Sequence, residues 1–167
     1  RRFPSFSQAL FNRYSLLTRL FPQNRFSRAY LMSNLHHREV QDVDWVSGAC
    51  LMVRREVLEE VGLLDERFFM YSEDVDYCFR IWQAGWKVTY LPFAQVYHLI
   101  GQSSKRARRM TILERHLSLF RFFKKHYSRY LMFLDLVTWL TVKFRCGVQL
   151  ALITGQKSWD RLAGKSA

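Results

Sequence analysis

The sequence has few of the residues that hold small extracellular domains together or bind structural zinc. Its three cysteines, Cys50, Cys78 and Cys146, are far apart, and no C-x-x-C pair occurs. This spacing argues against a zinc site and against a disulfide framework. Lone thiols in apolar surroundings are typical of core residues in a reducing compartment. Internal repeats and low-complexity tracts are also missing, so we expect an ordinary globular chain.

The chain also lacks the pattern of a signal peptide. It begins at Arg1 rather than at Met, and we expect it to be a fragment of a longer chain. Of its 167 residues, 49% are hydrophobic and 24% are charged. This length is enough for one domain with a core and is short for two.

Acidic residues are scarce except in the middle of the chain. The net charge is +6 over residues 1–41, −5 over 42–104 and +11 over 105–167. Basic flanks favour a polyanionic partner such as nucleic acid, phospholipid or a sugar diphosphate. We therefore predict a basic lead-in with short helices at 6–20 and 25–32, a central folded part over 42–104, and basic, apolar helices that associate with a membrane over 105–167.

The hydrophobic pattern of the central part predicts alternating strands and helices. Three short apolar or alternating runs are predicted strands: residues 46–54, 87–91 and 94–99. Two predicted helices each end at a glycine: Arg55–Val61 before Gly62, and Ser72, as the cap, to about Ala84 before Gly85. The predicted fold class is therefore α/β, a partial mixed sheet with flanking helices.

Two further helices are predicted in the basic C-terminal part. Residues 111–128 have an expected apolar side: Leu113, Leu117, Phe120 and Tyr127. Residues 130–153 are long enough to cross a membrane but include Asp135, Lys143 and Arg145. Each such charge near the bilayer centre costs roughly 2.5–3.5 kcal/mol, so we expect a helix that lies on the membrane rather than one that spans it. A helix pair packed on the domain or on a partner is the alternative.

Five short motifs follow one another through the central part. They are VDWVSGACLMVRR at 43–55, GLLDERFF at 62–69, YSEDVD at 71–76, AGW at 84–86, and VYH at 96–98 with Gly101 and Ser103. This ordered set resembles the acceptor-side half of a family 2 glycosyltransferase, in the branch that includes bacterial rhamnosyltransferases of surface-polysaccharide assembly. It covers a little over a third of the chain.

The resemblance implies a GT-A-like α/β fold and an inverting sugar transferase. The donor would be a nucleotide-sugar that carries a sugar such as rhamnose, and the acceptor would be a lipid-linked or polysaccharide glycan of the cell envelope. The enzyme would work at the cytoplasmic face of the plasma membrane, as a peripheral or monotopic protein on an anionic surface. The nucleotide-binding half of such an enzyme is not found in this sequence.

The resemblance assigns the catalytic chemistry to Glu73 and Asp74. An inverting sugar transferase needs a base that takes the proton of the acceptor hydroxyl as its oxygen attacks the anomeric carbon. By the family's pattern Asp74 is this base, at the start of a helix whose N-terminus favours a carboxylate. Alone, the two acids would only complement the helix dipole. Asp76 is expected to pair with Arg80, four residues on, and to be structural.

Four residues are predicted to contact sugars. Trp45 and Gly48 would form the floor of the sugar pocket, where glycine allows close approach of the backbone. Phe69 and Tyr71 would line an acceptor groove. Packing within the core or the loop explains the three aromatic residues equally well.

Three basic residues are predicted near phosphate groups. His98 would join a metal or the diphosphate, or would be an ordinary histidine at a strand end. Arg106 and Arg109 belong to a basic cluster that would contact a diphosphate or a lipid phosphate, or would be solvated.

A divalent metal, Mg or Mn, is implied for the full-length enzyme, with no assured site in this chain. Asp42 and Asp44 form a D-x-D, but the family's metal motif lies well upstream of the tryptophan strand. We therefore expect these two residues to lie at the start of a strand, exposed to solvent, rather than to bind a metal.

Two other functions stay open. A non-catalytic module derived from a glycosyltransferase, docked on a membrane or on another protein, would keep the same motifs. A basic nucleic-acid-binding protein is the second rival. The acidic middle and the lack of a recognition motif argue against it, so no nucleic-acid partner is expected.

Overall fold

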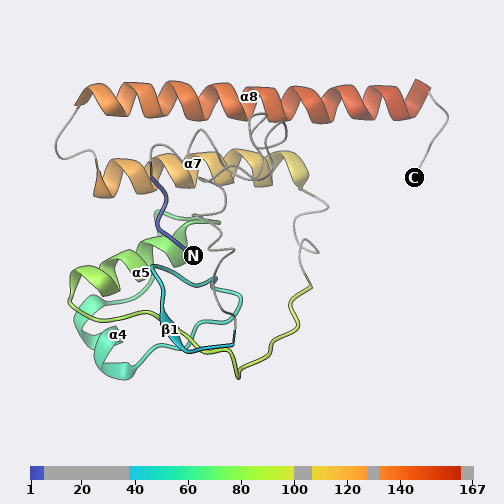
Figure 1. The fold of residues 1–167 in the computed structure, drawn as a ribbon. Coiled ribbons are helices and arrows are strands. Elements are labelled where there is room, and N and C mark those ends of the chain that lie inside the picture. Colours follow the sequence, from blue (N-terminus) through green and yellow to red (C-terminus); the bar gives the residue numbers. More distant parts are fainter. Residues whose placement is uncertain (6–37, 100–106, 128–131, 163–167) are drawn as a thin grey trace. The chain divides into compact units, whose positions relative to one another are not determined.

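The computed structural model describes residues 1–5, 38–99, 107–127 and 132–162 (Figure 1). The chain divides into two units, Arg1–Ile100 and Gly101–Ala167. The helices predicted at 6–20 and 25–32 lie outside the described residues.

A small antiparallel sheet joins two distant parts of the first unit. Strand β1 (Gln41–Asp42) pairs with β2 (Thr89–Tyr90), with Gln41 opposite Tyr90 and Asp42 opposite Thr89. The Asp42 carboxylate secures this register, since it accepts a hydrogen bond from Thr89 Oγ1 at 3.0 Å and lies 2.9 Å from Lys87 Nζ. The sheet thus brings the beginning and the end of the motif-bearing segment together.

Two helices lie between these strands, as the sequence predicts. Helix α4 (Arg55–Val61) ends at Gly62, whose φ of 80° is one that glycine adopts without strain. Helix α5 (Glu73–Gln83) is followed by Gly85 with a φ of 84°. Both helix predictions are confirmed. The predicted side-chain cap is wrong, because Ser72 itself adopts a left-handed conformation and its side chain makes no capping bond.

The core of the first unit forms around α5. Its buried apolar residues come from the two helices and from the segments that flank the helices and the strands: Val43, Trp45, Val57, Phe68, Val75, Tyr77, Cys78, Ile81 and Val88. Trp82 Nε1 donates to the carbonyl groups of Val43 and Asp44, at 3.2 and 3.1 Å. This contact ties α5 to the segment that follows β1.

The predicted sheet is only partly found. Among the described residues the sheet has two strands and is antiparallel rather than mixed. The strand predicted at 46–54 is wrong, since this segment contains a turn at 48–50, and the one predicted at 94–99 is an exposed coil. The strand predicted at 87–91 is reduced to Thr89–Tyr90. Strands require hydrogen-bonded neighbours, and the described residues supply them only for β1 and β2.

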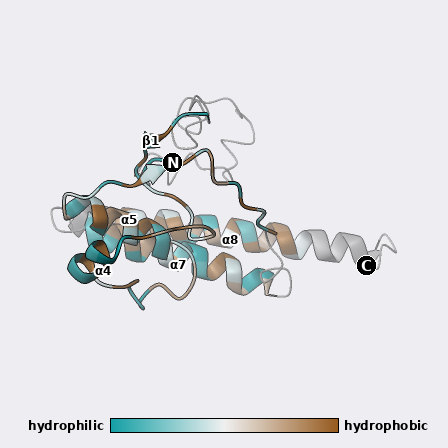
Figure 2. Ribbon diagram, turned by 90° about the horizontal axis from the view of Figure 1, so that it is seen from below, coloured by the Kyte–Doolittle hydropathy of each residue, from teal (hydrophilic) through white to brown (hydrophobic). Residues whose placement is uncertain are grey.

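The second unit is a pair of helices. Helix α7 (Arg108–His126) and helix α8 (Met132–Leu162) run side by side in opposite directions (Figure 1). Ile112 of α7 clusters with Cys146 and Ile153 of α8, and Leu150 packs against this cluster. Both predicted helices are confirmed with shifted bounds, and the hydropathy along them can be followed in Figure 2.

The predicted apolar side of α7 is wrong. Leu113 and Leu117 are exposed. The buried residues of this helix are instead Thr111, Ile112, His116, Ser118, Phe122 and Phe123. The helix has apolar residues on more than one side, and packing selects the side that includes Ile112.

Candidate active site

A strained turn leads into α5. Tyr71 and Ser72 have φ values of 68° and 63°, the left-handed region that non-glycine residues rarely occupy. Such conformations cost about 1–3 kcal/mol each and often occur at functional sites. The turn places three acids in the first turn of the helix: Glu73, Asp74 and Asp76.

The Asp74 carboxylate is held in place by backbone groups. Its Oδ1 accepts a hydrogen bond from the Val75 N–H at 2.9 Å, and its Oδ2 accepts one from the Gly48 N–H at 3.0 Å. The residue is half-buried, so water reaches it. Each carboxylate oxygen has more than one acceptor site, so the group can still receive a proton from a substrate.

Gly48 lies in a turn, where the Cys50 N–H donates to the Ser47 carbonyl at 3.2 Å. A Cβ atom added at Gly48 would lie 3.5 Å from Asp74 Cβ and 3.9 Å from Asp74 Oδ2. The turn backbone therefore lies directly against the carboxylate. The structure thus brings together Gly48 and Asp74, two residues that the sequence predicts for the site.

Glu73 has a different environment from its neighbour. It is half-buried, and its Oε2 is a buried oxygen with no hydrogen-bond partner among the described residues. Burial raises the pKa of the Glu73 carboxyl, and the adjacent Asp74 charge raises it further, although a bond to its own backbone N–H opposes them. Two adjacent acids in unlike environments are suited to different roles.

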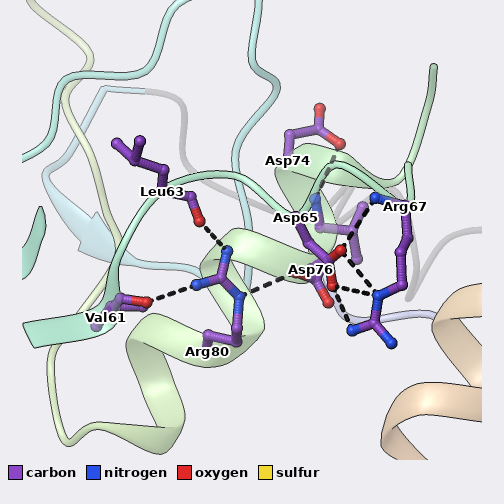
Figure 3. A network of polar contacts seen from close by, with 8 residues as sticks. Val61, Leu63, Asp65, Arg67, Asp74, Asp76 and Arg80 are labelled. Atoms are coloured by element: carbon purple, nitrogen blue, oxygen red, sulfur yellow. Dashed lines mark hydrogen bonds and ion pairs between the residues drawn. The ribbon is translucent and has the colours of Figure 1, made fainter. Parts of the chain in front are cut away.

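Arg80 connects α5 to the end of α4 (Figure 3). Its Nε donates to Asp76 Oδ2 at 3.0 Å, and its two terminal nitrogens donate to the carbonyl groups of Val61 and Leu63, both at 2.7 Å. The Asp76 side chain is 0% exposed. The predicted pairing of Asp76 with Arg80 is confirmed.

The two carbonyl contacts were not predicted from the sequence. The Val61 carbonyl is at the end of α4, where carbonyl groups have no partner within the helix, and this indicated that a nearby arginine could bind it. No such signal marked the Leu63 carbonyl, which lies in the loop beyond the helix. Through these contacts Arg80 holds the loop that leads to the strained turn, and so positions the site without belonging to it.

A second ion pair shapes the loop between the helices (Figure 3). Arg67 Nη2 lies 2.6 Å from Asp65 Oδ2, and the Arg67 backbone N–H also donates to this carboxylate. Phe68, next in the chain, is buried, whereas Phe69 is 75% exposed. Tyr71 is half-buried. The exposed Phe69 ring is therefore accessible to a ligand, and its sugar contact stays a prediction.

Trp45 is buried in the first unit. Its Nε1 donates to the Arg2 carbonyl at 2.8 Å, and its backbone N–H donates to the Arg1 carbonyl at 3.2 Å. The indole thus packs in the core, three residues from Gly48. A role as the floor of a sugar pocket stays a prediction.

The predicted phosphate-binding residues belong to different parts of the chain. His98 is exposed in the coil after β2. Arg109 belongs to α7 in the second unit, where its Nη2 donates to Thr154 Oγ1 at 3.4 Å. Arg106 lies outside the described residues. Their roles stay predictions.

The described residues do not fit a metal ion. No group of three or more His, Cys, Asp or Glu side chains among them is placed to hold one. Of the D-x-D pair, Asp42 binds Lys87 and Thr89, and this hydrogen bonding lowers its pKa. Asp44 Oδ2 accepts a hydrogen bond from the Phe3 N–H at 2.7 Å. Both carboxylates therefore have structural partners.

Comparisons with known proteins agree on one family. A rhamnosyltransferase of Mycobacterium tuberculosis, named N-acetylglucosaminyl-diphospho-decaprenol L-rhamnosyltransferase, is 37% identical over 115 residues, which are 69% of this chain and 37% of that protein. Rhamnosyltransferase WbbL of Escherichia coli is 38% identical over 56 residues, 34% of this chain and 21% of that protein. A third relative is the Haloferax volcanii low-salt glycan biosynthesis hexosyltransferase Agl10, 42% identical over 41 residues, 25% of this chain and 13% of that protein.

The chain thus spans 37% of the length of its mycobacterial relative. No solved structure matches it. The sequence model described as "Glycosyltransferase like family 2" matches residues 6–114, which is more than half of the chain. The motifs, the match and the relatives agree, and the chain belongs to the family 2 glycosyltransferases.

Proposed function

We propose that this chain carries the acceptor-side, catalytic part of an inverting glycosyltransferase. The observation that carries the proposal is the Asp74 carboxylate, which two backbone N–H groups hold at the start of α5. The names of the bacterial relatives support transfer of a sugar such as rhamnose. The donor would be a nucleotide-sugar, and the acceptor a lipid-linked or cell-envelope glycan at the cytoplasmic face of the plasma membrane.

In this proposal Asp74 is the base. The acceptor hydroxyl gives its proton to the carboxylate while its oxygen forms a bond to the anomeric carbon of the donor. On the opposite side of that carbon the bond to the diphosphate oxygen breaks, and its electron pair leaves with the nucleoside diphosphate. The configuration at the carbon therefore inverts. The backbone bonds from Val75 and Gly48 hold the carboxylate in one orientation before the proton moves.

Glu73 has a supporting part in this proposal. Its raised pKa reduces the repulsion between the two neighbouring acids as a substrate displaces water from the site.

Other residues are assigned to substrate contacts within the same proposal. The exposed Phe69 ring would stack on the acceptor sugar, beside Tyr71. His98, Arg106 and Arg109 would supply positive charge to the departing diphosphate. A divalent metal, Mg or Mn, would be held by residues outside those described, and no step above depends on it.

The test is Asp74→Asn in the intact protein. Asparagine keeps the shape of the side chain and cannot accept the proton, so we expect sugar transfer to a lipid-linked acceptor to fall about 10²–10⁴-fold, the usual contribution of a general base. Binding of the nucleotide-sugar, measured by calorimetric titration, should change little. Wild-type turnover by this variant would show that Asp74 is not the base.

A matched control is Glu56→Gln, which also exchanges a carboxylate for an amide. Glu56 is an exposed residue of α4, so both transfer and donor binding should stay at wild-type levels. An intact protein that binds donor but never transfers sugar, with or without Asp74, would favour the non-catalytic alternative.

A further inference from the structure

The outward side of α8 carries a continuous row of exposed apolar side chains. The row consists of every fourth residue over four turns: Leu136, Leu140, Phe144, Val148 and Leu152. At 1.5 Å per residue it extends about 24 Å. We call these five residues the outer row, and none of them belongs to the buried cluster that packs on α7.

The opposite side of α8 is occupied by α7. Thr138, Val142, Cys146 and Ile153 are buried, and the last two pack with Ile112. With 3.6 residues per turn, these positions fall on one side of the helix and the outer row on the other. The helix is therefore apolar on two sides, of which the described unit covers one.

The charged residues of this stretch lie between the two sides. Lys143 and Arg145 are the only charged residues from 136 to 155, and both fall at the flanks of the outer row. Lys143 Nζ lies 4.1 Å from the centre of the Trp139 ring, so a tryptophan and a lysine are paired along one flank. Such residues prefer the headgroup level of a bilayer, where the ring is half-immersed and the ammonium group stays wet.

Segment Leu136–Gly155 is long and apolar enough to cross a membrane. Its packing argues against that arrangement. Helix α7, which runs beside it, carries six Lys and Arg residues: Arg108, Arg109, Arg115, Arg121, Lys124 and Lys125. If α8 crossed a bilayer as part of this pair, it would draw these cations into hydrocarbon.

We propose that α8 lies in the plane of an anionic membrane and inserts its outer row below the headgroups. The net charge of +11 over residues 105–167 makes anionic lipid the favoured occupant, because a second copy of this unit would be repelled. This inference rests on the proposed function, for which it names the membrane face of the protein. The experiments below measure membrane binding and not sugar transfer. A result that contradicts membrane binding is therefore distinguishable from one that contradicts the proposed catalysis.

The first experiment is co-sedimentation of the intact protein with vesicles. We use phosphatidylcholine alone and phosphatidylcholine mixed with phosphatidylglycerol. The double variant L140S/F144S should bind the mixed vesicles about tenfold or more weakly than the wild type, because it loses two of the five apolar side chains of the outer row, Phe144 among them. Binding should also weaken with added salt, since exposed charges are screened over about 10 Å at 0.1 M.

The control is L91S/F93S in the first unit. Leu91 and Phe93 are 55% and 81% exposed, which closely matches Leu140 and Phe144 at 52% and 74%. The control should bind as the wild type does. Equal losses in both double variants, or no loss in either, would overturn the proposal. Self-association that L140S/F144S abolishes in the absence of lipid would assign the outer row to a second copy instead.

The second experiment measures how deeply three positions of α8 lie in the bilayer. Single cysteines at positions 136, 144 and 152 are labelled with a fluorophore, in a protein whose exposed Cys50 is replaced by serine. Nitroxides placed at different depths along the lipid chains then quench the label. Because each fourth residue lies about 40° further around the helix, position 144 faces the lipid chains most directly. An in-plane helix keeps all three labels within about 10 Å of the headgroups. A label at 144 near the bilayer centre, about 12 Å deeper than those at 136 and 152, would show a spanning helix and would overturn the proposal.

Discussion

The two units of this chain are stabilised in different ways. In the first, directional polar contacts join distant segments beside the apolar core: Arg80 binds one carboxylate and two carbonyl groups, and Asp74 binds the turn at Gly48. In the second, two helices pack along a shared apolar seam that includes Ile112 and Ile153. The first arrangement fixes the orientation of particular groups, whereas the second leaves a broad apolar side exposed.

This difference matches the parts that we propose for the units. A base must be held in one orientation, and directional hydrogen bonds do this better than apolar contacts. Binding to an anionic membrane requires exposed apolar area and positive charge, and a long helix with basic flanks provides both. In our proposal the acidic middle of the sequence carries out the reaction, and the basic C-terminal part holds the protein at the membrane.

The largest effect on stability is expected from Arg80→Ala. This change leaves the buried Asp76 charge and the Val61 and Leu63 carbonyl groups without the guanidinium. Removing one partner of a buried ion pair typically costs about 3–5 kcal/mol. Hydrogen exchange of the amides of the first unit should show this loss, while those of α7 and α8 should not change.

The matched control is Arg55→Ala, which removes another i,i+4 ion pair. Arg55 and Glu59 are both largely exposed, so the cost should stay below about 0.5 kcal/mol. If the two variants lost the same stability, polar contacts would not be what holds the first unit.

A smaller effect is expected from Ile153→Ala in the second unit. This side chain is buried in the cluster with Ile112 and Cys146. Its truncation should cost about 2–3 kcal/mol, because the helix pair can close only part of the space. Leu136→Ala, in the exposed outer row, should change stability by less than about 0.5 kcal/mol. Hydrogen exchange of α7 and α8 measures both, and a larger loss at Leu136 would contradict the assignment of the seam.

The smallest effect is expected from Glu73→Gln, and it depends on pH. The folded pKa of Glu73 is raised above its ordinary value of 4.5, chiefly by burial. Below pH 4.5 the carboxyl is protonated in both the folded and the unfolded state, so the variant should match the wild type. As the pH rises through the ordinary and then the raised pKa, the wild type must bury a charge and loses stability.

Glu73→Gln should therefore be the more stable protein at pH 7, by less than about 1 kcal/mol because half of the side chain faces water. Urea unfolding at pH 4 and at pH 7 measures the difference. A variant that is less stable than the wild type at pH 7 would show that Glu73 makes favourable contacts as an anion.

Local features were predictable from the sequence. Gly62 and Gly85 mark the ends of α4 and α5 because glycine adopts a positive φ without strain. The spacing of Asp76 and Arg80 predicts their ion pair, since residues four apart meet on one side of a helix. The motifs that led to the family are also local, and the family match confirms them.

Features that join distant segments were not predictable. An apolar run such as residues 46–54 becomes a strand only where a neighbour offers its hydrogen bonds, and here the run contains a turn instead. That turn places the Gly48 N–H 3.0 Å from a carboxylate 26 residues away. The same limit explains α7, whose buried side is selected by its packing and not by its own hydropathy.

The sequence by itself thus determined the helices of the first unit, the family and the identity of the candidate base, because each depends on residues close together in the chain. Only the tertiary structure decided what orients Asp74, how Arg80 joins the two helices, and which side of α8 stays exposed. The physical reason is that hydrogen bonds and apolar contacts between distant segments depend on positions in space, which a periodic pattern along the chain does not specify.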